Sequence, residues 1–219
     1  MSHRSFKDRI YPQFARIGQA LASGRRLEVL DLLAQGPRNV EALAEEAEMS
    51  VANVSQHLQI LRAARLVEAH REGTKVVYRL AGDDVLRLWL TLRSAAESRL
   101  AEVGEITRES LGDRDGEKLV PRDELERLLE ERKAYLIDVR PILEYEAGHL
   151  PGAVPMPIEE LAHRLEEIPR DRPVVAYCRG EYCLFADDAV ALLKQRGFDA
   201  FRLEGGWPEW RVEGRPTAA

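Results

Sequence analysis

The sequence has 219 residues, of which 45% are hydrophobic and 32% are charged, enough for two modest domains. No stretch approaches the roughly 18 uninterrupted apolar residues of a membrane-spanning helix, and residues 1–8 lack the apolar core of a signal peptide. The two cysteines are too few for a disulfide framework and are more typical of a catalytic or redox-active thiol pair. We therefore expect a cytoplasmic globular protein without a membrane partner.

The net charge of -6 argues against nucleic-acid binding by the chain as a whole, but the charge is unevenly distributed. Residues 1–82 carry a net charge of +3, and the remaining residues carry -9. This asymmetry predicts two modules with different partners, of which only the first tolerates phosphate.

The first half has a mainly helical pattern. Apolar residues recur at helical spacing through residues 14–33, and Gly36-Pro37 ends that pattern. Further helices are predicted over residues 40–47, with Asn39 as N-cap, and over residues 51–61. Residues 67–71 and 76–80 are predicted strands of a hairpin. Asp83 begins a long helix with an apolar stripe that runs from Trp89 through Leu92 and Leu100 to Val103.

The second half alternates helices with short apolar strands. Strands are predicted over residues 134–138, 173–177 and 200–203, with helices at 125–129, 161–168 and 186–195. This order is typical of an α/β domain whose parallel sheet is covered on both faces. Residues 111–118 contain two glycines among charges and are predicted to be a linker between domains at 1–110 and 119–219.

A helix, a tight turn, a second helix and a hairpin form the winged helix-turn-helix arrangement, in which the second helix enters the major groove of DNA. The candidate base-reading residues on that helix are Asn53, Ser55, Gln56, His57 and Gln59. The candidate phosphate contacts on the helix end and the wing are Arg62, Arg71, Lys75 and Arg79. The alternative is a solvated polar face on a small helical domain, which periodicity alone does not separate from DNA binding.

The residues at 49–61, 64–67, 71–73 and 78–80 resemble the ArsR/SmtB repressors, over about residues 10–103. The resemblance implies a homodimer, formed by the first and last helices of the module, on a two-fold operator in double-stranded DNA. The stripe through Trp89, Leu92 and Leu100 suits that dimer face, although it also suits an intramolecular core. One departure is Arg65, where the family usually has glycine at a helix end.

Members of this family that sense metals use cysteines before the recognition helix or His and carboxylate sets on the last helix. Residues 39–48 contain no cysteine, and the helix from Asp83 contains no histidine. We therefore expect no metal site and no cofactor, and a signal that comes from the second module.

In the second module, the strand at 174–177 runs into Cys178, and a helix follows Cys183. A thiol in this position meets backbone N–H groups and the positive end of the helix dipole, which favour the thiolate. We therefore expect Cys178 to be a nucleophile with a lowered pKa. Gly180 lets the loop curve, and Arg179 supplies a cation for an anionic sulfur donor.

The segments at 137–140, 144–153 and 203–207 resemble the framing motifs of the rhodanese (sulfurtransferase) domain, over residues 117–215. The resemblance implies that Cys178 is the sulfur-carrying nucleophile with Arg179 beside it. Supporting roles fall to Gly180, Glu181 and Tyr182 in the loop and to Asp138 and Arg140 outside it. His149 is interpreted as a satisfied loop histidine.

The loop departs from the family at its fifth position after the nucleophile, where thiosulfate-using members have a basic residue and this chain has Cys183. This departure argues against thiosulfate turnover. Leu184 at the sixth position argues against phosphatase or arsenate reductase chemistry, which needs arginine there. Cys183 is either a small buried residue or a resolving thiol that forms a disulfide or a sulfur-bridged link with Cys178.

The favoured hypothesis is a repressor whose rhodanese domain responds to sulfane sulfur at Cys178. The donor would be thiosulfate, a polysulfide or a low-molecular-weight persulfide. One alternative is an active rhodanese-type sulfurtransferase whose DNA-binding half controls its own operon. Another is a repressor that responds to arsenite or a further thiophilic metal held by the two cysteines.

Overall fold

The computed structural model describes residues 3–112 and 118–219. The chain forms two compact units, Met1–Thr91 and Leu92–Ala219. The division falls inside one helix, α5 (Asp83–Arg99). Most of the predicted linker at 111–118 lies outside the described residues. Within the described part of the chain, no helix combines the length and apolar character needed to cross a membrane.

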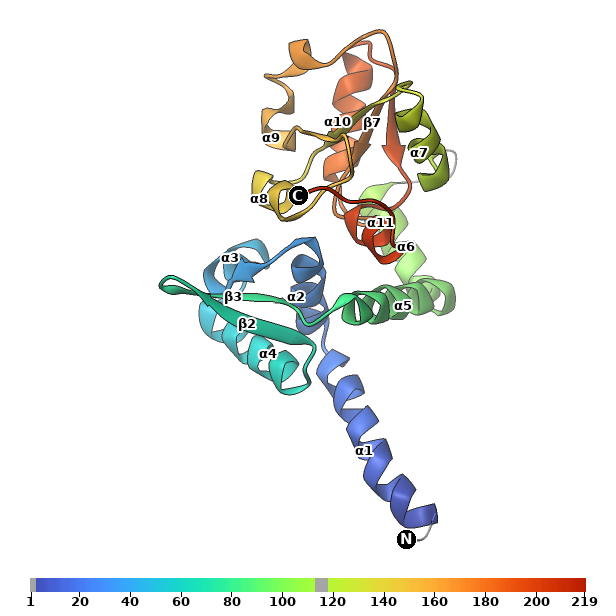
Figure 1. Ribbon diagram of the computed structural model, residues 1–219. Helices are drawn as coiled ribbons and strands as arrows, with labels where there is room; N and C mark the ends of the chain where they lie inside the picture. The colour runs from blue at the N-terminus through green and yellow to red at the C-terminus, as the bar shows by residue number, and fades with distance from the viewer. Residues whose placement is uncertain (1–2, 113–117) are drawn as a thin grey trace. The chain divides into compact units, whose positions relative to one another are not determined.

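The first unit is a winged helix-turn-helix, as predicted (Figure 1). Its helices are α1 (His3–Leu21), α2 (Gly24–Gln35), α3 (Val40–Glu46) and α4 (Val51–Ala63). The wing is an antiparallel hairpin of β2 (Val67–Glu72) and β3 (Lys75–Leu80), to which β1 (Arg38–Asn39) adds a short third strand beside β3. The helical pattern predicted from residue 14 onward therefore belongs to two helices, because the helix is interrupted between Leu21 and Gly24.

Side-chain caps fix the starts of the two helices of the DNA-binding motif. The Asn39 side chain accepts a hydrogen bond of 2.8 Å from the Ala42 amide at the start of α3, which confirms the predicted cap. Ser50 caps α4 in the same way through the Asn53 amide. Each cap satisfies an amide that the helix itself leaves unpaired.

The end of α4 uses a left-handed residue. Arg65 has a φ of 61°, and its amide donates to the Arg62 carbonyl while the Leu66 amide donates to the Leu61 carbonyl. This pair of hydrogen bonds is the Schellman motif, which favours glycine at the left-handed position. The departure from the family at Arg65 therefore preserves the backbone geometry, with a non-glycine residue in a strained conformation.

The long helix predicted from Asp83 through Val103 is wrong in its second part. The helix α5 ends at Arg99, and α6 (Ala101–Leu111) begins after Leu100, which has extended backbone angles. The first part of α5 packs into the first unit, where Val85 and Leu86 are buried and the Trp89 indole donates to Asp31. The stripe beyond it faces outward, since Leu92 is 37% and Leu100 is 51% exposed. It is therefore not an intramolecular core.

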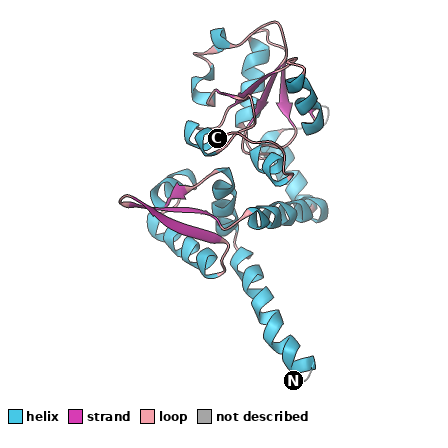
Figure 2. Cartoon of the chain, in the orientation of Figure 1, coloured by secondary structure: helices cyan, strands magenta, loops and turns pink. Residues whose placement is uncertain are grey.

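The second unit contains the predicted parallel sheet (Figure 2). Its strand order is β4-β8-β7-β5-β6. These strands are β4 (Leu119–Val120), β5 (Tyr135–Asp138), β6 (Val154–Pro155), β7 (Val174–Tyr177) and β8 (Ala200–Leu203). The helices are α7 (Arg122–Glu130), α8 (Ile142–Ala147), α9 (Ile158–Leu161), α10 (Phe185–Gln195) and α11 (Trp207–Val212). Where one helix was expected over 161–168, the chain forms only the short α9 and a 3-10 turn at Leu165–Glu167.

Two apolar clusters cover the central strands β5 and β7. One contains Ile137, Ala176 and Leu193, and the other contains Leu136, Val175 and Trp210. Successive residues of each strand therefore point into opposite clusters, as a strand buried on both faces requires. This central position places the carboxyl end of β7, and with it Cys178, next to the start of α10.

Candidate functional site

The predicted DNA-reading residues lie on α4, but they do not share one face. Asn53, Gln56 and Gln59 are exposed at three-residue spacing, opposite the buried Val54 and Leu58. Ser55 and His57 are half-buried on the flanks, because helical geometry turns them toward the neighbouring elements. The exposed row is the part of α4 that is free to meet base edges.

The predicted phosphate contacts are all exposed. Arg62 lies on the last turn of α4, Arg71 is on β2, and Lys75 and Arg79 are on β3. Arg79 forms an ion pair of 2.9 Å with Glu68 across the hairpin, which reduces the charge that it offers to DNA. A basic wing beside a polar helix suits binding to the DNA backbone.

The cysteine loop, residues 178–183, connects β7 to α10. The Cys178 side chain is fully buried, and its Sγ lies 3.7 Å from the Gly180 carbonyl oxygen and 3.6 Å from the Cys183 carbonyl oxygen. Both oxygens lie within hydrogen-bonding reach of the protonated thiol, whose single proton is donated to one acceptor at a time. The Gly180 and Ala186 amides also reach the sulfur, but burial outweighs them and raises the pKa of Cys178 well above the ordinary value of a thiol. The expectation of a lowered pKa at Cys178 is therefore wrong.

The pKa of Cys183 shifts in the opposite direction, because Cys183 is partly exposed and accepts hydrogen bonds. The Cys178 thiol donates to it, and so do the amides of Arg179 and Phe185, the first residue of α10. These hydrogen bonds outweigh partial burial and lower the pKa of Cys183 to about 7. Backbone N–H groups were expected to stabilise a thiolate at Cys178, but they stabilise negative charge mainly on Cys183.

Arg179 does not point a free guanidinium at the loop. Its guanidinium pairs with Glu144 of α8 at 2.6 Å and 2.9 Å, and Glu144 is only 2% exposed. This ion pair connects the loop to α8, and the role of Arg179 as a cation for a sulfur donor stays a prediction. Its positive charge still contributes weakly to the low pKa of Cys183.

Two residues that sequence reasoning missed hold the loop backbone. Arg202 of β8 donates to the carbonyl oxygens of Gly180 at 3.2 Å and Glu181 at 3.0 Å. Gly206 approaches so closely that a Cβ atom there would lie 2.4 Å from the Cys178 carbonyl oxygen. The loop is therefore pre-organised by its surroundings. An arginine inside the apolar segment 200–203 was the signal that could have revealed Arg202.

Asp138 and Arg140 are fully buried and pair with each other, and their supporting role stays a prediction. The Arg140 guanidinium donates to Asp138 at 2.6 Å and to the Gly148 carbonyl at 2.8 Å. The Tyr177 hydroxyl donates to the same carboxylate at 2.5 Å. This network ties the end of β5 to the end of β7. The Nδ1 atom of His149 donates a hydrogen bond to the Tyr145 carbonyl, and the His149 ring stacks on the Tyr145 ring, which fits a satisfied loop histidine.

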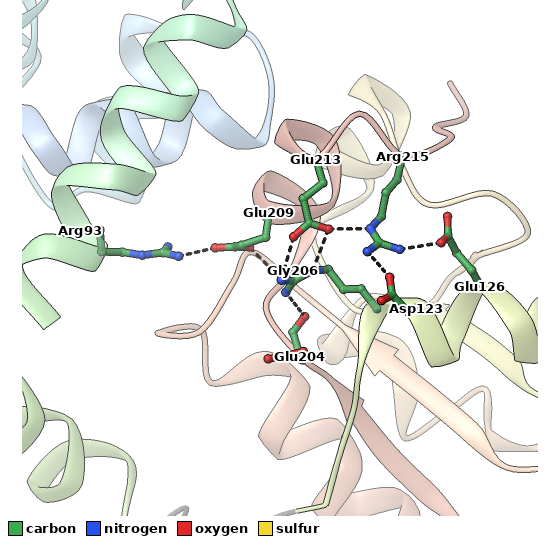
Figure 3. A network of polar contacts seen from close by, with 9 residues as sticks. Arg93, Asp123, Glu126, Glu204, Gly206, Glu209, Glu213 and Arg215 are labelled. Atoms are coloured by element: carbon green, nitrogen blue, oxygen red, sulfur yellow. Dashed lines mark hydrogen bonds and ion pairs between the residues drawn. The ribbon is translucent and has the colours of Figure 1, made fainter. Parts of the chain in front are cut away.

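The cysteine loop also connects to the second part of α5, which lies in the second unit. The Tyr182 hydroxyl donates to Glu97 at 2.8 Å. Figure 3 shows Arg93 paired with Glu209, whose carboxylate also accepts from the Gly206 amide at 2.8 Å. The same view shows a neighbouring network at the C-terminal end, in which Arg215 pairs with Glu213, Glu126 and Asp123. Glu209 and Glu97 carried no signal in the sequence, because surface helices contain many glutamates.

A metal site would need more ligands than the two thiols. Among the described residues, no group of three or more His, Cys, Asp and Glu side chains could hold a metal ion. The donor set around Cys178 and Cys183 therefore contains two sulfur atoms and backbone groups, which suits thiol chemistry better than a closed metal site.

Comparison with protein families matches both units. The family described as "Bacterial regulatory protein, arsR family" matches residues 23–69, and the family described as "Rhodanese-like domain" matches residues 121–213.

Individual proteins are similar to the whole chain or to part of it. The chain is 48% identical to the HTH-type transcriptional regulator Rv0324 of Mycobacterium tuberculosis, over 96% of this chain and 92% of that protein. It is 35% identical to a sulfurtransferase of Allochromatium vinosum, over 43% of this chain and 87% of that protein. A solution structure of the homodimeric winged helix-turn-helix DNA-binding domain Mb0332 from Mycobacterium bovis has 49% identity, covers 46% of this chain and 91% of that one, and gives a TM-score of 0.43.

Proposed function

Because this chain belongs to the arsR family of bacterial regulatory proteins and carries a rhodanese-like domain, we propose that it is a homodimeric repressor of transcription that senses sulfane sulfur through the cysteine loop. The observation that carries the proposal is the course of α5. Its first part packs in the DNA-binding unit through Leu86 and Trp89, and its second part contacts the cysteine loop through Glu97. A structural change at the thiols can therefore reach the DNA-binding unit through one continuous helix, α5.

The DNA-binding half of the proposal rests on α4 and the wing. The exposed polar row of α4 presents amides that suit base edges in the major groove. The basic residues of the wing suit phosphates on either side. We place operator DNA on this surface.

The dimer half of the proposal rests on α1. Phe6, Tyr11 and Phe14 are 56%, 61% and 63% exposed, and Ala20 is the buried residue of this helix. An exposed aromatic row on a helix favours burial against a second copy of the chain. The exposed Leu92 and Leu100 beyond the first unit add apolar surface that the same assembly could cover.

Sulfur would act by changing the loop. The donor is a polysulfide or a low-molecular-weight persulfide, because the loop lacks a free cation for thiosulfate. Adding sulfur to a thiol in a closely packed loop, or joining the two thiols, alters the contacts that Tyr182 and Gly206 make. A difference of a few kcal/mol between the two states is enough to change operator occupancy by orders of magnitude.

The test measures operator affinity on one preparation in two states. Operator DNA is first enriched from random duplexes with the reduced protein, and its affinity is then compared before and after treatment with inorganic polysulfide. We expect at least about tenfold weaker binding after treatment, recovery with a dithiol reductant, and no response in a Cys178→Ser, Cys183→Ser double variant. Equal affinity of the reduced and treated wild-type protein would refute the proposal.

A second candidate function is sulfur transfer as an enzyme. It is favoured by the 35% identity to the Allochromatium vinosum sulfurtransferase, which this chain covers almost completely. Repeated transfer from a persulfide donor to a thiol acceptor, at a rate that DNA does not change, would support it. A single stoichiometric reaction followed by arrest would favour the sensor.

A further inference from the structure

Arg202 of β8 contacts the cysteine loop through two carbonyl oxygens and has no part in the function proposed above. We propose that Arg202 is a positioning residue for sulfur chemistry at Cys178. Its charge, acting through the Gly180 carbonyl, favours the Cys178 thiolate and the persulfide anion that sulfur uptake leaves on it. This assignment rests on the proposed sulfur response and identifies a charge that makes a buried thiol reactive.

One carbonyl group connects Arg202 to the Cys178 sulfur. The Gly180 carbonyl oxygen lies 3.7 Å from Cys178 Sγ and accepts a hydrogen bond of 3.2 Å from Arg202 Nη2. The same nitrogen donates to the Glu181 carbonyl at 3.0 Å. The partial negative charge of the Gly180 oxygen opposes ionisation of the thiol. Because the guanidinium is hydrogen-bonded to that oxygen, it offsets this charge.

Burial strengthens the effect of the Arg202 charge. Arg202 is 5% exposed and Cys178 has no exposed surface, so water screens their interaction less than it screens a surface pair. The Arg202 Nε atom is buried and has no hydrogen-bond partner among the described residues. Buried donors without a partner are rare in folded proteins. The surrounding groups therefore leave the guanidinium incompletely satisfied, which favours a further negative charge nearby.

The counter-ion of Arg202 is Asp187, in the first turn of α10. Its Oδ1 atom lies 3.2 Å from Arg202 Nη1. The Asp187 side chain is 19% exposed, whereas the Arg202 side chain is 6% exposed. Water therefore screens the carboxylate more than it screens the guanidinium, and the pair leaves a net positive potential inside the unit.

The other charged side chains around the loop are paired more closely than Arg202. Glu144 of α8 lies 2.6 Å from Arg179 and is buried. Glu209 of α11 pairs with Arg93. In each of these pairs a carboxylate compensates its cation at short distance. The remaining titratable side chains of the loop and its neighbours are Glu181, Tyr182, Cys183 and Glu97.

The sulfur step with a persulfide donor, RS–SH, conserves atoms and electrons. The Cys178 thiol loses its proton, and the thiolate attacks the terminal sulfur of the donor. A new S–S bond forms while the donor S–S bond breaks, and its electron pair leaves on RS⁻, which takes up a proton to give RSH. The sulfane sulfur keeps its oxidation state and ends on Cys178. Arg202 favours the thiolate and the persulfide anion alike, because both place negative charge beside the Gly180 carbonyl.

Two substitutions of opposite charge test this role. Arg202→Gln removes the cation and should raise the pH midpoint of the Cys178 titration by about one unit, whereas Asp187→Asn removes the counter-ion and should lower it by a similar amount. Arg202→Lys keeps the charge and should lie closer to the wild-type protein than Arg202→Gln does. NMR of cysteine labelled at its β-carbon follows the titration in the folded full chain.

The matched controls are Arg196→Gln and Asp188→Asn. They remove the same charges from exposed positions at the end and in the first turn of α10, and they should leave the midpoint unchanged. Sulfur uptake from glutathione persulfide is the second measurement. Tryptic cleavage after Arg179 separates the two cysteines, so peptide mapping reports on Cys178 alone. At neutral pH, uptake on Cys178 should be at least about threefold slower in Arg202→Gln.

A wild-type midpoint in Arg202→Gln would overturn the assignment. So would a shift of Arg202→Gln and Asp187→Asn in the same direction, which a purely structural role predicts. If Arg202→Gln does not fold, an unchanged midpoint in Asp187→Asn overturns it alone. The proposed function fails separately. A shifted Cys178 titration with unchanged operator affinity after polysulfide refutes the sensor alone, whereas operator release without the shift refutes the role of Arg202 alone.

Discussion

Tyr182 of the cysteine loop donates a 2.8 Å hydrogen bond to Glu97 of α5. Burial and the adjacent carboxylate raise the pKa of Tyr182 above its ordinary value, so its hydroxyl stays protonated and remains a donor. Tyr182 is the immediate neighbour of Cys183. A movement of the second thiol therefore changes a contact with the helix that begins in the DNA-binding unit.

We first predict that Arg93→Ala weakens the response to sulfur without preventing sulfur uptake. Arg93 pairs with Glu209, which holds Gly206 against the loop, and it also pairs with Glu97. Loss of these pairs should leave thiol modification measured by mass within about twofold of wild type, while polysulfide treatment changes operator affinity by less than half as much on a free-energy scale. Arg99→Ala is the matched control, because it removes the same charge from an exposed position of α5. An undiminished response in Arg93→Ala would contradict the coupling.

The second prediction concerns pH. The lowered pKa of Cys183 means that its thiolate is present above about pH 7 and is lost as the pH falls below that value. The alkylation rate of Cys183 should therefore rise about tenfold per pH unit below the midpoint and level off above it. Stopped-flow alkylation with peptide mapping measures this profile. A midpoint near that of an ordinary thiol would show that the hydrogen bonds to Cys183 do not stabilise its charge.

Arg65→Gly should stabilise the DNA-binding unit. Arg65 occupies the left-handed position of the Schellman motif, where a side chain costs about 1 kcal/mol that glycine avoids. We expect the free energy of unfolding to increase by roughly 0.5–1 kcal/mol, measured by urea denaturation. The control is Arg62→Gly, which places glycine inside α4 and should decrease stability by about 1 kcal/mol. Equal effects of the two substitutions would argue against strain at Arg65.

Asp138→Ala should strongly destabilise the rhodanese-like unit. The substitution removes the carboxylate from a fully buried ion pair and leaves the Arg140 guanidinium without its partner. Breaking such a pair costs about 3–5 kcal/mol. Asp171→Ala removes a carboxylate whose side chain is 67% exposed, and it should cost less than about 1 kcal/mol. Urea denaturation that separates the two unfolding transitions tests both, and similar costs would contradict the structural role of Asp138.

A fifth prediction separates phosphate contacts from base contacts. Lys75→Ala removes an exposed charge from the wing and should reduce the slope of log affinity against log salt by about 1, with equal effects on operator and random DNA. Gln56→Ala on α4 should weaken operator binding and leave random DNA unaffected. Lys133→Ala, which removes an exposed lysine from the second unit, is the control for net charge. An unchanged salt slope in Lys75→Ala would show that Lys75 of the wing does not contact DNA phosphates.

The sequence by itself determined the architecture. Helical spacing, the Asn39 cap, the hairpin and the alternating second half predicted the winged helix-turn-helix and the parallel sheet, because local periodicity and turn chemistry act over a few residues. The prediction of one helix across Leu100 was wrong because the apolar spacing continues through Leu100, where the backbone is extended and no proline or glycine marks the end of the helix.

Only the tertiary structure decided the character of the two thiols. Position at a strand end made Cys178 the expected thiolate, but its depth in the core and the carbonyl oxygens near its sulfur oppose ionisation. The partners of the loop, among them Glu144, Arg202 and Glu209, come from segments far apart in the chain. Burial and long-range hydrogen bonds set a pKa, and neither can be read from the order of residues in a six-residue loop.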